Sequence, residues 1–208
     1  PATDEERKEM QRLLHEGMDA GLCGFSIQRL GPDSVQADFD GSPMVTDTMV
    51  DEDILALAEV LRERDEGFIQ ITQAEGPLQA DQAFLEKLAA TANRPVLHNV
   101  VVPARTNPEL HRRPMRWIED CRERGLPLYA QCATVRTGFA FTLEHWNLYD
   151  ASPAWRAVTT GSKEEKLAKL QDPELRQALV DEADTADKRL RAIQAGVGGN
   201  PKFLMIQD

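Results

Sequence analysis

The chain is short of positive charge, of cysteine and of long apolar runs, and each shortage excludes a class of protein. Its 208 residues include 35 Asp and Glu against only 24 Lys and Arg, a formal net charge of −11. This net charge argues against a protein that binds nucleic acid or anionic lipid, since both contacts need a basic face. No run approaches the roughly 20 apolar residues of a membrane span, and the first residues do not resemble a signal peptide. We therefore expect neither nucleic acid nor a membrane as a partner.

Cysteine is too sparse for a disulfide framework. Cys23, Cys121 and Cys132 are odd in number and far apart, which favours a reducing cytoplasm. The glycine-rich dinucleotide and phosphate motifs are absent, as are the HExxH and GxSxG motifs of two hydrolase classes. The hydrophobic content of 41% and charged content of 28% are those of a folded globular protein.

What the sequence does contain is an alternation of amphipathic helices and short apolar strands over residues 1–133. Apolar residues at helical spacing predict helices that begin near residues 4, 51, 81 and 107. Apolar runs predict strands over 22–27, 68–72, 95–102 and 126–132, with a possible further strand over 203–206. This pattern is typical of a parallel sheet with helices packed outside it. Both an open doubly wound sheet and part of a (β/α)8 barrel fit the order, since a complete barrel needs about 250 residues and eight strands.

Two segments depart from the alternation. Residues 29–50 are expected to form a long polar loop, which could be either a lid over a binding site or a disordered segment. Residues 134–208 are expected to form an irregular aromatic segment and a helical extension. Its helices are predicted over 162–170 and 172–193, the second with an Asp cap followed by Pro at its first position.

Candidate functional residues lie at the carboxyl ends of the predicted strands, where open α/β sheets and barrels both place their sites. The polar residues there are Ser26, Gln28, Thr72, Gln73, Glu75, His98, Asn99, Gln131, Thr134 and Arg136.

Three of the candidate residues admit a structural role as well as a chemical one. His98 could ligate a metal or move a proton, or it could be a core histidine bonded to a carbonyl. Arg136 could hold a substrate carboxylate or form a structural ion pair. Cys132 could act as a nucleophile if a base lowered its pKa, although free cysteines are usually small buried residues. A metal-independent hydrolase or lyase that uses Cys132 or His145 is the enzyme alternative.

Several segments, in order, resemble the N-acyl-D-amino-acid deacylases of the metal-dependent amidohydrolase superfamily. Residues 18–26, MDAGLCGFS, resemble that family's EAGAxGFS segment, and residues 53–58 resemble the helix after its mobile loop. Further similar segments are Arg94–Val96, Leu128–Gln131, Trp155–Arg156 and Leu170–Arg176.

The resemblance implies part of a (β/α)8 TIM-like barrel with about four to five parallel strands, completed by segments or companion chains absent from this sequence. It further implies a divalent metal, most simply zinc, with His98 as a ligand or catalytic helper and Gln131 as a second catalytic residue. Substrate contacts would come from Ser26, Gln28, Thr72, Gln73, Asn99 and Arg136.

The sequence also departs from the family. Its HxH pair and metal-binding Asp are not found here, and Thr72-Gln73 stands where a metal-binding His is expected. One histidine cannot hold a catalytic zinc, which usually takes three protein ligands.

The function expected from the resemblance is hydrolysis of the C–N amide bond of a small N-acyl amino acid-like substrate. We expect this chain alone to be inactive and to work within an oligomer or a completed barrel. The alternative is a non-catalytic binding or assembly subunit built on the same scaffold.

Overall fold

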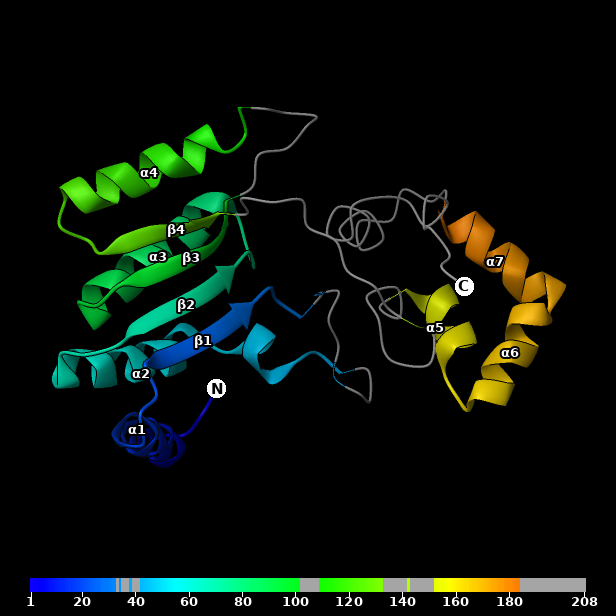
Figure 1. Ribbon diagram of the computed structural model, residues 1–208, viewed down its shortest axis with the longest axis horizontal. Helices are drawn as coiled ribbons and strands as arrows, with labels where there is room; N and C mark the ends of the chain where they lie inside the picture. Colours follow the sequence, from blue (N-terminus) through cyan, green and yellow to red (C-terminus); the bar gives the residue numbers. More distant parts are fainter. Residues whose placement is uncertain are drawn as a thin grey trace. The chain divides into compact units, whose positions relative to one another are not determined.

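The protein is described by a computed structural model over residues 1–32, 34, 38, 42–101, 109–132, 142 and 152–183. The chain divides into two compact units (Figure 1). The first contains residues 1–32 and 45–135, and the second contains residues 33–44 and 136–208.

The first unit is an alternation of helices and strands. Its helices are α1 (Asp4–Asp19), the short 3₁₀ helix η1 (Val45–Thr48), α2 (Asp51–Arg64), α3 (Leu78–Ala92) and α4 (Arg112–Glu123). Its strands are β1 (Gly24–Arg29), β2 (Phe68–Gln73), β3 (Val96–Val101) and β4 (Leu128–Cys132). All four expected strands are present, each within about two residues of the predicted ends.

The four strands form one parallel sheet in the order β1-β2-β3-β4 (Figure 1). Each strand therefore pairs with the next one along the chain, with one α-helix in every crossover and the short η1 as well in the first. Because such crossovers are right-handed, a sequential order places all the crossover helices on the same face. The expected α/β class with a parallel sheet is confirmed.

The hydrophobic core lies between that one face of the sheet and the helices. Alternate strand residues are buried in it, because successive side chains of a strand point to opposite faces. From the strands the core takes Ile27, Ile69, Ile71, Val96 and Leu128. From the helices it takes Met18, Ile54, Ala58, Leu61, Phe84, Leu85, Leu88, Ala89, Ala92 and Cys121.

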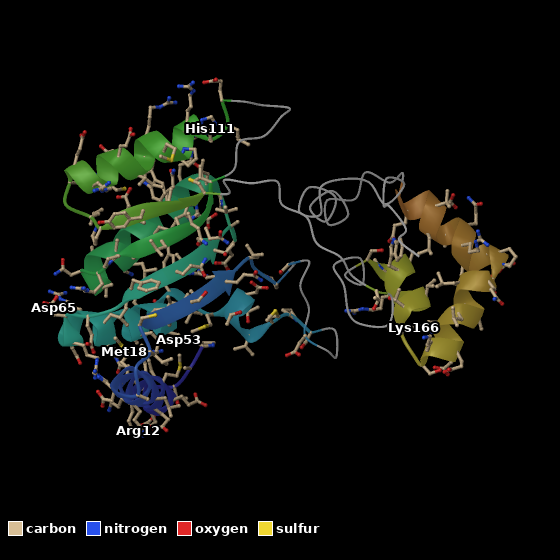
Figure 2. The ribbon with its side chains drawn as sticks, in the orientation of Figure 1. Arg12, Met18, Asp53, Asp65, His111 and Lys166 are labelled. Carbon is tan, nitrogen blue, oxygen red and sulfur yellow. The ribbon has the colours of Figure 1, made fainter. Side chains whose placement is uncertain are left out.

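Helix α1 is fixed to α2 at its amino-terminal end. Asp53, which is buried at the start of α2, accepts hydrogen bonds from the backbone N–H of Ala2 and from Arg7, each at 3.0 Å. Figure 2 shows Asp53 among these elements. The start of α1 therefore lies beside the start of α2, at the edge where the strands end.

The expected start of the third helix at Asp81 is wrong by three residues, since α3 begins at Leu78. Asp81 is buried inside the first turn, where its carboxylate accepts from Gln73 at 2.8 Å and from the backbone N–H of Glu75 and Gly76. Its side chain therefore orders the loop after β2. Helix α4 begins at Arg112, after turn residues 109–111 and so later than the predicted start near residue 107, and Pro114 lies in its first turn.

The second unit contains α5 (Pro153–Thr159), α6 (Lys163–Gln171) and α7 (Pro173–Ala183). The predicted cap of the last helix is confirmed, because Asp172 accepts from the backbone N–H of Glu174 at 2.8 Å. Ser162 and Glu165 form a capping box on α6. The remainder of the predicted helix over 172–193 and the possible strand over 203–206 lie outside the described residues.

Two glycines before β1 and within it provide a test of the sheet's packing. Gly21 and Gly24 both have positive φ, +107° and +131°. A Cβ on Gly24 would overlap the carbonyl oxygen of Phe68, whereas a Cβ on Gly21 would meet nothing within 4 Å. We expect Gly21→Ala to cost about 1–2 kcal/mol for its backbone conformation, and Gly24→Ala about 1–3 kcal/mol more from the overlap. Urea unfolding measures both, and equal losses would contradict this register of β1 and β2.

A partly buried carboxylate joins α3 to α4. Glu86 accepts from Trp117 Nε1 at 2.8 Å and from Arg124 at 2.9 Å. The Arg124 hydrogen bond lowers the pKa of Glu86 from its ordinary 4.5 to about 2. Burial raises the pKa of the adjacent Cys121 thiol to about 11, which keeps this thiol protonated.

The stability supplied by Glu86 should depend on pH. Since its pKa is lower in the folded protein, this contribution is complete above pH 4.5 and is lost as the pH falls toward 2. Glu86→Gln should therefore destabilise the protein more at pH 7 than at pH 3, in urea unfolding of variant and wild type. The matched change Glu59→Gln, at an exposed position of α2, should show no such difference. An equal effect of Glu86→Gln at both pH values would contradict the assigned ion pair.

Candidate functional site

The face of the sheet opposite the helices carries a row of uncharged polar side chains near the carboxyl ends of the strands. The backbone register pairs Gln28 with Thr72, Thr72 with Asn99, and Asn99 with Gln131. Partners in a parallel register lie side by side and point to the same face. Each of these four side chains lies an odd number of positions from a core residue of its own strand, and so points to the face opposite the core. The four therefore form one row, with one residue from each strand. We call it the amide row.

Hydrogen bonds order the amide row. Asn99 Nδ2 donates to Thr72 Oγ1 at 2.9 Å. Gln28 Nε2 lies 3.3 Å from both carboxylate oxygens of Asp47 in η1. Asp47 is fully buried, and it also accepts from the backbone N–H of Leu30 at 2.9 Å. One end of the row is therefore fixed to the segment after β1, while Gln131 at the other end is exposed.

A second row lies one step earlier along the strands on the same face. It consists of Ser26, Gln70, Leu97 and Tyr129 in register. The Ser26 hydroxyl donates to Gln70 Oε1. This second row becomes apolar toward β4, where it consists of Leu97 and Tyr129. The same face therefore carries hydrogen-bonding groups in the amide row and partly apolar groups one step earlier along the strands.

An open apolar hollow lies at the opposite ends of the strands. Its volume is about 450 Å³, and its lining includes Leu22, Phe68, Pro95 and Leu97. It lies at the amino ends of β1, β2 and β3, away from the amide row. It adds no group with acid–base or ligand chemistry beyond Cys23 and Glu66.

Five of the predicted site residues thus share one face: Ser26, Gln28, Thr72, Asn99 and Gln131. Gln73 and His98 lie on the other face, toward the helices. Gln73 is buried and donates to Asp81 at 2.8 Å. Arg136, Thr134 and His145 lie outside the described residues.

His98 packs in the helix layer. Its ring meets Trp117 of α4 edge to face, with centroids 6.1 Å apart. Burial lowers the pKa of His98, and the charge of Asp81 opposes the shift only in part. Its buried Nδ1 has no hydrogen-bond partner within the described part of the chain. Burial therefore favours the neutral imidazole, which lies against an aromatic ring on the face away from the amide row.

The described residues do not by themselves fit a zinc site. Within them, no three His, Cys, Asp or Glu side chains lie close enough together to hold a metal ion. The amide row supplies carboxamides and a hydroxyl, whereas zinc takes thiolate, imidazole and carboxylate ligands. Ligation by His98 stays a prediction that requires further ligands from elsewhere.

The sequence analysis missed two polar residues that contact or share a face with the amide row, Gln70 and Asp47. Gln70 could have been found, because it lies two positions before Thr72 and so shares its face. Asp47 gave no local signal, since its partners Gln28 and Leu30 are 17 or more positions away in the chain.

Arg29 organises the loops behind the amide row. It is buried at the end of β1 and points to the helix side, where its guanidinium lies 4.6 Å from the ring centroid of Phe84. It forms ion pairs with Asp51, at 2.7 Å, and with Glu75. One cation thus links the start of α2 to the loop after β2.

Comparisons of the chain with protein-family models, with curated proteins and with solved structures found no match. In the described parts of the chain, no helix has both the length and the apolar character required to cross a membrane.

The loop linkage predicts a large effect of Arg29 on stability. Arg29→Met leaves two acidic side chains without their cation, and we expect a loss of about 2–3 kcal/mol. This is less than the 3–5 kcal/mol for breaking a fully buried pair, because Asp51 and Glu75 are each about a third exposed.

The matched control is Arg12→Met on the solvent side of α1 (Figure 2), where the ion pairs with Glu9 and Glu16 are exposed and contribute little. Urea unfolding of both variants measures the contrast. Equal losses would show that Arg29 does not hold the loops together.

Proposed function

We propose that this chain is the substrate-binding half of a (β/α)8 barrel hydrolase. Its reaction is cleavage of the C–N amide bond of small N-acyl amino acid-like compounds. The observation that carries the proposal is the amide row, which presents four hydrogen-bonding side chains from four adjacent strands on one face.

The sheet order supports a barrel over a doubly wound sheet. In a doubly wound sheet the strand order reverses at a switch point and helices cover both faces. Here the order is sequential, and helices α1 to α4 all contribute to the core on one face. Four such units make half of an eight-stranded barrel, and the face away from these helices becomes its interior.

The chemistry of the row suits an amide group. A substrate amide offers one N–H donor and one carbonyl acceptor. Asn99 Nδ2 donates to the Thr72 hydroxyl oxygen. This leaves the Asn99 Oδ1 acceptor and the Thr72 hydroxyl proton for other partners. Gln131 adds both a donor and an acceptor. The row carries no charge, so it selects an uncharged polar group.

The resemblance to deacylases implies that a divalent metal, when bound, would activate the water that attacks the amide carbonyl. The described residues leave its ligands to other segments or chains. In this proposal the amide row orients the scissile amide, and Asp47 keeps Gln28 in place. Arg136 remains the proposed partner of the substrate carboxylate.

The second candidate is a binding subunit without chemistry. The observation that favours it is the lack of a three-residue metal-binding group among the described residues. Both candidate functions predict binding of the same ligand, but only the first predicts that the ligand is hydrolysed. Release of free amino acid from N-acetyl-D-leucine in the presence of Zn²⁺ separates them, measured on the chain as it assembles in solution.

Binding to the amide row is tested by titrating the ¹⁵N-labelled chain with N-acetyl-D-leucine. We expect saturable shifts at the ends of β2, β3 and β4. Asn99→Leu and Gln131→Leu should each weaken binding about 2- to 10-fold, the loss of one hydrogen bond of about 0.5–1.5 kcal/mol.

The matched control is Gln79→Leu, the same chemical change at an exposed position of α3, which should leave the affinity unchanged. Shifts that map to the helix layer, or an affinity that is insensitive to Asn99 and Gln131, would contradict the proposal.

A further inference from the structure

A buried negative charge lies behind the β1 end of the amide row. Asp47 is fully buried, and both of its carboxylate oxygens lie 3.3 Å from Gln28 Nε2. The same carboxylate accepts from the backbone N–H of Leu30 at 2.9 Å. Within the described residues, no cationic side chain pairs with it. A buried charge is screened less than an exposed one, so Asp47 gives this end of the row a negative field.

The nearest cation at that end does not offset Asp47. Arg29 is the last residue of β1, but its side chain points to the helix side of the sheet. There it is shared by two carboxylates, those of Asp51 and Glu75. The charge around the end of β1 therefore remains negative.

The β4 end of the row lies beside positive charge. Helix α4 follows β3 and packs on β4, so it begins at the edge where the strands end (Figure 1). Its first two turns carry Arg112, Arg113 and Arg116, all exposed, and its first turn has no acidic residue. Arg112 pairs with Glu109, whereas Arg113 and Arg116 have no ion-pair partner in the described parts of the chain.

The two ends are far enough apart to act separately on a small ligand. Neighbouring strands lie about 4.8 Å apart, so the first and last residues of the four-membered row are roughly 14 Å apart. This separation exceeds the Debye length of about 8 Å at physiological salt. Since the row itself is uncharged, the flanking charges decide which end an anionic group approaches.

We propose that the amide row holds its substrate in one direction, with the carboxylate toward β4 and the acyl group toward β1. Asp47 is then a specificity-determining residue, because its charge repels a negatively charged acyl group. The substrate class is N-acyl amino acids with a free carboxylate and an acyl group that carries no negative charge. The inference rests on the proposed function and adds the direction of binding. The position of Arg136 in the sequence, shortly after β4, agrees with this direction.

The first experiment measures the affinity of the wild-type chain for two matched pairs of compounds by calorimetry. N-acetyl-D-leucine and N-acetyl-D-leucinamide differ only in the charge of the leucine carboxyl group. N-succinyl-D-leucine and N-succinamoyl-D-leucine differ only in the charge at the end of the acyl group. We expect the charged member to bind about 3- to 10-fold tighter in the first pair and about 3- to 10-fold weaker in the second, since opposite charges attract and like charges repel across a binding site.

The outcomes separate this inference from the proposed function. If none of the four compounds binds, both are refuted. If N-acetyl-D-leucine binds at the amide row but either pair shows no preference or the reverse preference, the direction is refuted and the proposed function stands.

The second experiment removes the charge of Asp47. Asp47→Asn keeps an acceptor for the backbone N–H of Leu30, and circular dichroism checks that the variant is folded. We expect the succinyl and succinamoyl compounds to bind within about twofold of each other, with the preference of the acetyl pair unchanged, because the repulsion acts at the acyl end. Each comparison is made within one variant, so a general loss of affinity cancels.

The matched control is Asp65→Asn (Figure 2), at an exposed left-handed position after α2 that asparagine tolerates. It should leave both preferences as in the wild type. A folded Asp47→Asn variant that still disfavours the succinyl compound as strongly as the wild type would overturn the assigned role of Asp47.

The third experiment removes charge at the other end. Arg113→Gln/Arg116→Gln should reduce the preference for N-acetyl-D-leucine over its amide by about twofold, and should leave the succinyl pair unchanged, because this field acts near β4. The matched control, Arg12→Gln/Arg62→Gln, removes the same charge from exposed positions of α1 and α2 and should change neither preference. An equal effect of the two double variants would overturn the contribution of α4.

Discussion

Burial of a single face of a four-stranded parallel sheet is the constraint on which the rest of this structure depends. Isoleucine, valine and leucine side chains of all four strands pack under the helices, and fully buried residues such as Ile71, Leu88 and Val96 exclude water from that layer. At roughly 25 cal/mol per Å² of apolar surface removed from water, this contact dominates the stability of the unit. The same contact decides which strand residues point to the opposite face of the sheet.

The candidate site follows from that division. Once Ile27 and Ile71 point to the helices, Gln28 and Thr72 must point away, because strand side chains alternate. The parallel register then aligns them with Asn99 and Gln131. Polar residues on the face opposite the helices are not part of the hydrophobic core and can serve binding, whereas Arg29, on the helix side, is held by acidic partners and an aromatic ring.

Much of this arrangement could be predicted from the sequence. Apolar runs gave the four strands, and alternation alone would have separated Gln73 and His98 from the amide row, since each is one position from a row residue. The sequence reasoning grouped residues by their place at strand ends and so joined both faces. Asp47 could not be predicted, because its burial depends on the folding of a long loop back onto β1. The start of α3 was misplaced because Asp81 was taken as the residue that begins the helix. Its carboxylate instead lies inside the first turn and accepts hydrogen bonds from the preceding loop.

The most direct test of the half-barrel account is hydrogen–deuterium exchange at the outer edges of β1 and β4. If the sheet is half of a closed barrel, backbone amides that point away from β2 and from β3 should exchange as slowly as those inside the sheet. Exchange at these outward amides as fast as in exposed loops, alongside protected amides in β2 and β3, would show an open four-stranded sheet and contradict the account.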